Sequence, residues 1–347
     1  MIDLAARHAA RASAVEERVL AVLRSGRWVG GPEVAEAEAL LAQWMGRPAA
    51  VGLASGTDAL MIALQAVGVR AGDEVIVPAL TFFATAGAVA QIGARPVVVD
   101  VLEDGLIDWN AVASARGPRT TAVIPVHLFG NRVAPTETDL LVVDDAAQAI
   151  GTAPHASIGR LTAVSAYPTK TWGAAGDAGF VCGEAAAVAD ARRLGNHGSD
   201  GAHVHRDVGG LVGRASRLDA IQAAVLLGHA PALAARIAAR RRLAARYDAG
   251  LPAGVTPLPR QPGSSVHQYC VTLDRRDKVA AALQDAGIGS AVYYRRPLDQ
   301  QPALAGARHT PTPTATRLCA RLLALPIGEH VDDADADRIL AALRGAS

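Results

Sequence analysis

Residues 72–100 read GDEVIVPALTFFATAGAVAQIGARPVVVD, and this stretch decides the fold class. Two apolar runs, Glu74–Pro78 and Pro96–Val101, have the composition of strands, and the alanine-rich segment Ala84–Gly93 between them has that of a helix. A strand, a helix and a strand in this order predict two parallel strands joined by a crossover. Because both strands are apolar apart from Glu74 and Asp100, we expect helices to cover both faces of the sheet.

The alternation continues on both sides of this unit. Before it, Ala49–Leu53 is predicted as a strand and Ala59–Ala66 as a helix. After it come four further strand candidates: Thr121–Val126, Leu140–Asp144, Thr162–Tyr167 and Gly179–Cys182. Only about a dozen residues separate the first two of these, which is near the minimum for a parallel crossover and leaves little room for a helix.

Helical patterns flank the sheet at both ends. Residues 2–24 and Glu33–Met45 precede it, and a long helix from Leu218 to about Arg246 follows it and is expected to link two domains. The rest contains strand candidates at Val266–Leu273 and Gly289–Tyr294, and helix candidates at Asp277–Ala286 and Ala334–Leu343. We therefore predict an α/β protein with a large domain of mostly parallel sheet flanked by helices, residues 1–228, and a smaller α+β domain, residues 229–347.

The composition narrows the functional class. The chain has 34 basic and 33 acidic residues, a formal charge of +1, so no global field attracts nucleic acid or a membrane surface. No signal-peptide pattern and no apolar run of membrane-spanning length is evident, which predicts a cytoplasmic protein. The three cysteines, Cys182, Cys270 and Cys319, are far apart and lack metal-ligand spacing, so we expect neither a disulfide framework nor a metal site.

Two segments at expected strand ends carry polar groups that suit an anionic ligand and a ring nitrogen. Ser55-Gly56-Thr57-Asp58 follows a strand and opens a helix, where free N–H groups and hydroxyls form a phosphate cradle. The alternative for this segment is a plain helix N-cap. Asp144 and Asp145 follow an apolar strand, where an acidic side chain can keep a pyridine nitrogen protonated; a helix cap beside a solvated acid is the alternative.

Lysine usage adds a third feature. Lys170 and Lys278 are the only lysines among the 34 basic residues, so a lysine retained here can be needed for amine chemistry that arginine cannot supply. Lys170 lies in a turn after the strand Thr162–Tyr167, and a partly desolvated lysine with a lowered pKa suits imine chemistry. A solvated lysine on an exposed turn is the alternative.

Taken together, these segments resemble the DegT/DnrJ/EryC1/StrS family, the sugar aminotransferase branch of the fold-type-I enzymes that depend on pyridoxal 5'-phosphate (PLP). The resemblance covers nearly the whole chain. The matching segments are GRWVGGPEV (26–34), GDEVIVPALTFFATA (72–86), IPVHLFG (124–130), DDAAQA (144–149), NHG (196–198) and SRLDAIQAAVL (216–226).

The resemblance implies a role for each matching residue. Lys170 matches the lysine that forms the internal Schiff base with PLP and moves the proton, and Asp145 matches the acid that pairs with the pyridinium. Other implied cofactor contacts are the ring contacts Phe82 and Gln148 and the phosphate contacts Gly56, Thr57 and Ser165. Possible substrate contacts are Trp28, His127, His197, Tyr293 and Arg295, with a structural hydrogen bond as the alternative for the two histidines. The resemblance also implies a homodimer with shared active sites, an amino-acid donor such as L-glutamate, and a keto sugar or cyclitol ketone as acceptor.

The chain departs from the family pattern in two places. Where relatives carry Gly-Tyr-Asn-x-Arg, it reads Gly213-Arg214-Ala215-Ser216-Arg217, so the asparagine that reaches the partner's phosphate is missing. Arg214 is the nearest candidate to replace it, with a solvated surface arginine as the alternative. The usual proline-leucine-histidine is replaced by Pro297-Leu298-Asp299. Two other functions stay open: a PLP-binding regulator without activity, and a PLP-dependent sugar dehydratase, against which the retained Lys170 argues.

Overall fold

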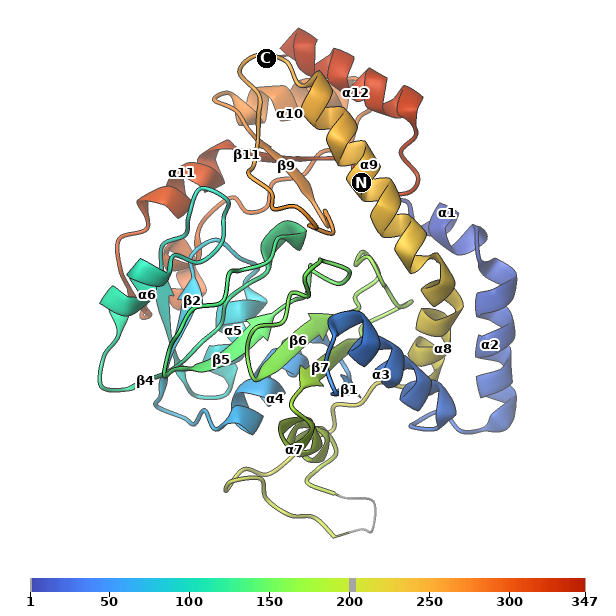
Figure 1. Ribbon diagram of the computed structural model, residues 1–347, viewed down its shortest axis with the longest axis vertical. Coiled ribbons are helices and arrows are strands. Elements are labelled where there is room, and N and C mark those ends of the chain that lie inside the picture. The colour runs from blue at the N-terminus through green and yellow to red at the C-terminus, as the bar shows by residue number, and fades with distance from the viewer. Residues whose placement is uncertain (1, 200–203, 347) are drawn as a thin grey trace.

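An eight-stranded sheet lies at the centre of the computed structural model, which describes residues 2–199 and 204–346 (Figure 1). The strand order is β1-β7-β6-β5-β4-β2-β3-β10, and β7 alone runs antiparallel to both of its neighbours. The predicted, mostly parallel sheet is therefore confirmed. The strand bounds are β1 Ala49–Leu53, β2 Glu74–Pro78, β3 Arg95–Val99, β4 Thr120–Val123, β5 Leu141–Asp145, β6 Leu161–Ser165, β7 Gly179–Gly183 and β10 Arg308–His309.

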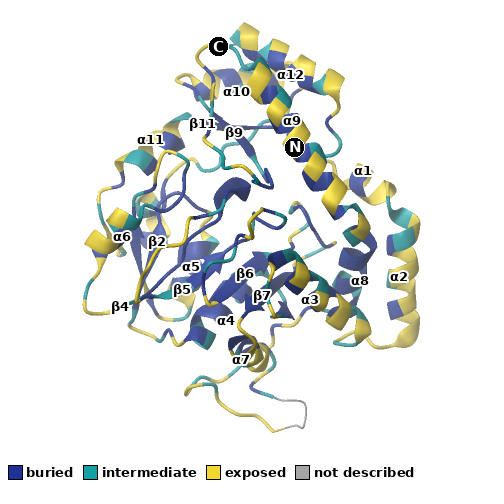
Figure 2. Ribbon diagram, viewed as in Figure 1, coloured by how far each residue is buried: buried dark blue, intermediate teal, exposed yellow. Residues whose placement is uncertain are grey.

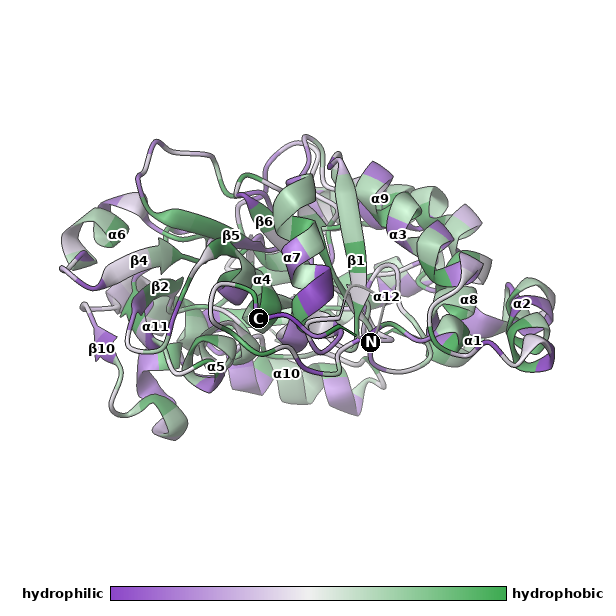
Figure 3. Ribbon diagram, turned by 90° about the horizontal axis from the view of Figure 1, so that it is seen from below, coloured by the Kyte–Doolittle hydropathy of each residue, from purple (hydrophilic) through white to green (hydrophobic). Residues whose placement is uncertain are grey.

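Helices cover both faces of this sheet, as the apolar strands predict. Successive side chains of a strand point to opposite faces, and in β7 the side chain of Val181 lies in one hydrophobic cluster while those of Phe180 and Cys182 lie in another. Figure 2 shows the buried sheet between helices whose outer faces are exposed, and Figure 3 shows β1 and β5 as hydrophobic ribbons. The helices of the large domain are α1 Leu4–Ala9, α2 Ala12–Ser25, α3 Pro32–Met45, α4 Gly56–Val67, α5 Ala84–Gln91, α6 Trp109–Ala115, α7 Ala185–Gly195 and α8 Ala220–His229.

A three-stranded antiparallel sheet and three helices form a second layer around their own hydrophobic cluster. The strand order is β11-β9-β8. The bounds of these elements are β8 Thr256–Pro257, β9 Tyr269–Thr272, β11 Leu322–Leu325, α9 Leu233–Gly250, α10 Arg276–Asp285 and α12 Asp333–Ala346. This unit lies above the large sheet in Figure 1, with α9 running between the two.

Several elements differ from the sequence-based expectation. The helix expected over residues 2–24 is broken between α1 and α2, and the linking helix is interrupted after His229 by a 3-10 turn that contains Pro231, which has no backbone N–H to donate. In place of a strand over 289–294 there is a single bridge, from Ala291 to Ala324. The chain also returns to the large domain, because β10 pairs with β3 and α11 (Pro313–Arg321) begins against Asp100.

The missing crossover helix is as expected. Between β4 and β5 the chain forms only a short 3-10 turn, Leu128–Gly130, and the two strands pair in parallel. One stretch of the described residues, Ala220–Gly250, is long and apolar enough to cross a membrane by length and composition. It contains α8 and α9, and 61% of its most apolar window is buried inside the protein, as in a core helix.

Candidate active site

Lys170 follows β6 in a tight turn. Its backbone N–H donates to the carbonyl of Tyr167 at 2.8 Å, and the strand end is held by a bond from Ala166 N–H to the Ala178 carbonyl. Burial lowers the pKa of the Lys170 amine below its ordinary value, and the charge of Asp145 acts in the opposite direction. The amine of Lys170 therefore loses its proton more easily than that of a solvated lysine.

Asp145 ends β5, the parallel neighbour of β6. Its buried carboxylate accepts hydrogen bonds from Thr85 Oγ1 at 2.9 Å and from the Ala147 N–H at 3.1 Å. Burial raises the pKa of Asp145, and these two bonds and the charge of Lys170 lower it, so burial outweighs them. A positive group beside this carboxylate, such as a protonated pyridine, would favour its ionised form.

Asp144 points to the other face of β5. Its Oδ2 accepts from the N–H groups of Ile158 and Gly159 and from Thr162 Oγ1, and its Oδ1 lies 3.3 Å from His127 Nε2. The other ring nitrogen of His127 accepts from the Val133 N–H at 3.0 Å, and the side chain has no exposed surface. The structure thus gives His127 the structural role and does not support the substrate contact.

The predicted phosphate cradle lies where β1 leads into α4. Ser55 caps the helix by accepting from the Asp58 N–H at 3.1 Å, and α4 begins at Gly56. A Cβ atom on Gly56 would lie 2.7 Å from Ser165 Cβ, so only glycine lets the helix approach the end of β6 this closely. Gly56, Thr57 and Ser165 are therefore brought together at the positive end of a helix.

Aromatic side chains line the space beside the carboxylate. Phe82 is 58% exposed, and its ring centroid lies 6.2 Å from that of Tyr294. Gln148 connects two segments: its Oε1 accepts from the Phe129 N–H at 2.8 Å and its Nε2 donates to the Tyr294 hydroxyl at 3.2 Å. Burial raises the pKa of Tyr294, and the charge of Asp145 adds to the effect despite the bond from Gln148.

Sequence reasoning missed Tyr294 and Thr85. It singled out Tyr293, the preceding residue, and no local pattern indicates which of two adjacent tyrosines faces the large domain. Thr85 lies within a segment that matches the family, but only the tertiary structure shows that α5 directs its hydroxyl to Asp145. The sequence signal that could have indicated Thr85 is its spacing of four residues from Thr81. In the structure the Oγ1 atoms of these two threonines lie 2.9 Å apart.

The remaining substrate candidates are spread around the site. Tyr293 lines a cavity of about 90 Å³ together with Thr169, next to the catalytic turn. Trp28 is 56% exposed, and His197 is also exposed. Arg295 is exposed and lies 3.5 Å from Asp277 of α10. Substrate contacts by these four residues stay predictions.

The prediction for Arg214 is not supported. Its Nη2 donates to Gln65 Oε1 at 2.9 Å, and its Nη1 lies 3.5 Å from Met61 Sδ. Both partners lie along α4 of the same chain, beyond the first turn that forms the cradle. A guanidinium held in this way is committed within its own subunit, so we withdraw it as the replacement for the missing asparagine.

Comparisons with known proteins agree with this geometry. The model of the DegT/DnrJ/EryC1/StrS aminotransferase family matches residues 10–344. The chain belongs to this family. It is 36% identical to the UDP-2-acetamido-2-deoxy-3-oxo-D-glucuronate aminotransferase of Pseudomonas aeruginosa, over 99% of this chain and 98% of that protein.

Solved structures of the family share the whole fold. The ketimine complex of DesV from S. venezuelae superposes with a TM-score of 0.91 at 36% identity, covering 99% of this chain and 96% of that one. The PLP form of a putative sugar aminotransferase from Streptococcus pneumoniae has a TM-score of 0.86 at 25% identity, covering 96% of this chain and 96% of that one. The protein is therefore a PLP-dependent aminotransferase of fold type I.

The residues present fit PLP. The close approach at Gly56 leaves backbone N–H groups and Ser165 for a phosphate, the exposed ring of Phe82 offers a stacking surface, and the buried Asp145 supplies a carboxylate for the ring nitrogen. Among the described residues, no cluster of three or more histidine, cysteine or acidic side chains is placed to hold a metal.

Proposed function

We propose that this enzyme transfers the amino group of L-glutamate to the keto group of a nucleotide-linked sugar. The observation that carries the proposal is the interaction of Asp145, which ends β5, with Lys170, in the turn after the adjacent β6, next to the helix N-terminus at Gly56. The relative from Pseudomonas aeruginosa is named for a UDP-linked 3-oxo sugar, which supports a ketone at ring position 3.

The roles of the residues follow from their surroundings. PLP, when bound, supplies the carbonyl that receives the amino group and a ring that accepts the electrons of the broken C–H bond. Lys170, with its lowered pKa, removes a proton from the donor's α-carbon and later returns one to the acceptor. Asp145 would hold the proton on the ring nitrogen, and the exposed ring of Phe82 would offer a stacking surface to the cofactor. Gln148 has a second amide hydrogen, beyond the one that it donates to Tyr294, which would be available to the ring oxygen.

We also propose a cytoplasmic homodimer with shared active sites. The family resemblance carries this proposal, and exposed apolar side chains offer surface that a partner would cover, among them the adjacent Trp28 and Val29. Other exposed apolar side chains are Tyr167 and Val212. Light scattering should give twice the chain mass. Mixing Lys170→Ala chains with chains altered in a partner-contacting residue should restore activity if the sites are shared.

Incubation with 15N-glutamate tests the function. The nitrogen should appear in the product of a UDP- or dTDP-linked 3-keto sugar, and a free cyclitol ketone serves as the competing acceptor. Transfer to the cyclitol alone would replace the proposed substrate class. A protein that binds PLP but whose absorption spectrum does not respond to glutamate would instead be a regulator or an idle family member. Loss of the sugar's hydroxyl without transfer of nitrogen would indicate a dehydratase.

A further inference from the structure

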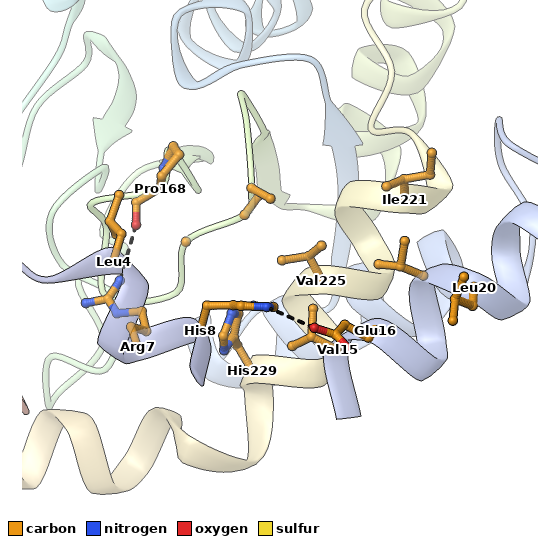
Figure 4. Close-up of a pocket in the computed structure, with 14 residues that line it drawn as sticks. Leu4, Arg7, His8, Val15, Glu16, Leu20, Pro168, Ile221, Val225 and His229 are labelled. Carbon is orange, nitrogen blue, oxygen red and sulfur yellow. Dashed lines mark hydrogen bonds and ion pairs between the residues drawn. The ribbon is translucent and has the colours of Figure 1, made fainter. Parts of the chain in front are cut away.

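Arg7 connects the N-terminal helix α1 to the catalytic turn. Its side chain is buried, and its Nη1 donates to the backbone carbonyl of Pro168 at 3.2 Å (Figure 4) and to that of Lys170 at 2.9 Å. Its Nε donates to Glu329 Oε1 at 2.8 Å. Glu329 lies between β11 and α12, so one guanidinium joins three segments that are distant in the sequence.

Helix packing alone does not hold this side of the turn. A cavity of about 680 Å³ lies between α1, α2 and α8 on one side and residues 173–175, which follow Lys170, on the other. Its walls are mostly apolar and include Leu4, Val15 and Val225. The hydrogen bonds from Arg7 therefore connect α1 to the catalytic turn at the edge of this cavity, where the side chains of the two segments do not pack against each other.

The buried Arg7 is paired with Glu329, a carboxylate that it shares with Arg236 and Arg240, and its Nη2 is buried without a hydrogen-bond partner. A buried charge is costly unless it is paired and hydrogen-bonded. Burial acts to raise the pKa of Glu329, but the charges of Arg7 and Arg240 outweigh it and lower that pKa, so the carboxylate stays ionised. Arg236 also faces this carboxylate, with its Nε 3.3 Å from Oε1.

We propose that Arg7 is a positioning residue for Lys170: it fixes the carbonyls of the turn and, through Glu329, ties the position of the catalytic amine to the small domain. This proposal rests on the proposed function only in taking Lys170 as the reacting amine. Asp145 from β5 and His267, which precedes β9, are the other titratable groups that interact with Lys170. Neither side chain donates a hydrogen bond to a backbone carbonyl of the turn, as Arg7 does.

The lysine content offers a direct test. Only Lys170 and Lys278 are present, so the full-length protein, grown with 13Cε-lysine and freed of cofactor, gives two lysine signals by NMR. Loosening the turn should expose the amine, and burial is what lowers its pKa. In Arg7→Met the titration midpoint of Lys170 should therefore rise by about half a unit or more, while the Lys278 signal stays unchanged.

Arg11→Met is the matched control. Arg11 lies four residues further on, is half-buried, and donates to a carbonyl at 3.2 Å, but that carbonyl belongs to Gly228 of α8. It should leave the Lys170 signal in place. Glu329→Gln removes the carboxylate that orients Arg7, so it should raise the titration midpoint of Lys170 by a smaller amount. If Arg7→Met does not fold, the Glu329→Gln variant tests the proposal.

Two results would overturn the proposal: a Lys170 midpoint that is unchanged in both Arg7→Met and Glu329→Gln, or an equal shift in Arg11→Met. Because the titration uses cofactor-free protein, its outcome is independent of transamination. A wild-type protein that fails to aminate any sugar would refute the proposed function and leave this measurement standing.

Discussion

Replacing Thr85 with valine should slow the reaction with glutamate about 10- to 100-fold. Thr85 has no exposed surface, and its Oγ1 donates to Asp145 Oδ2 at 2.9 Å. A hydrogen bond to a charged group contributes about 1.5–3 kcal/mol, and each ~1.4 kcal/mol is a factor of ten in rate. Valine preserves the shape of the side chain while removing the donor, so the carboxylate that holds the ring proton becomes less stable.

Replacing Thr85 should also change the pH dependence of the rate, through the pKa of Asp145. Burial already raises the pKa of Asp145, and the bond from Thr85 lowers it. Without that bond the pKa rises further, so Asp145 becomes ionised only at higher pH. Stopped-flow measurement of the PLP absorption band after mixing with glutamate should show the acidic limb of the rate moving to higher pH.

Thr81→Val is the matched control. Thr81 Oγ1 reaches Thr85 Oγ1 at 2.9 Å but makes no bond to Asp145, so the rate should change by less than about threefold. An unchanged rate and an unchanged acidic limb in Thr85→Val would refute this account of Asp145. Equal losses in both variants, together with a lower melting temperature, would indicate disturbed packing instead.

Three further substitutions test the site. Lys170→Ala should keep the fold by circular dichroism but abolish turnover, since the other lysine, Lys278, lies in α10 of the small domain. Gly56→Ala should weaken PLP binding about tenfold in a fluorescence titration, because the new Cβ would lie 2.7 Å from Ser165 Cβ; Gly345→Ala, whose Cβ meets nothing within 4 Å, should not. Arg214→Ala should retain PLP through dialysis as the wild type does, because its guanidinium is bound to Gln65; rapid loss would restore its role as a phosphate ligand.

Local sequence patterns predicted the strands and helices whose formation depends mainly on their own residues. Apolar runs bounded by turn residues gave β2 and β3 within a residue or two, and the alternation of side chains along β5 explains why Asp145 and Asp144 have different partners. The predicted division into a large domain, residues 1–228, and a small domain, residues 229–347, leaves out the return of β10 to the large sheet. The two-residue strand β10 carries no periodicity of its own, and it joins the large sheet through contacts that only the folded chain makes.

Contacts between distant segments could not be predicted. Arg7 and Glu329 are 322 positions apart, and nothing in either neighbourhood marks a buried pair. Tyr294 reaches Gln148 across 146 positions. Arg214 shows the opposite case, since a basic residue next to a missing ligand suggested a role, while the nearest acceptor along α4 determined its position.

Borohydride reduction of the purified holoenzyme, followed by peptide mass spectrometry, tests the central claim most directly. Reduction fixes the cofactor to whichever lysine amine carries it, and the chain offers only two. We expect a phosphopyridoxyl group on the peptide that contains Lys170 and none on the peptide that contains Lys278. A label on Lys278, or no label on either lysine in protein that retains PLP, would contradict it.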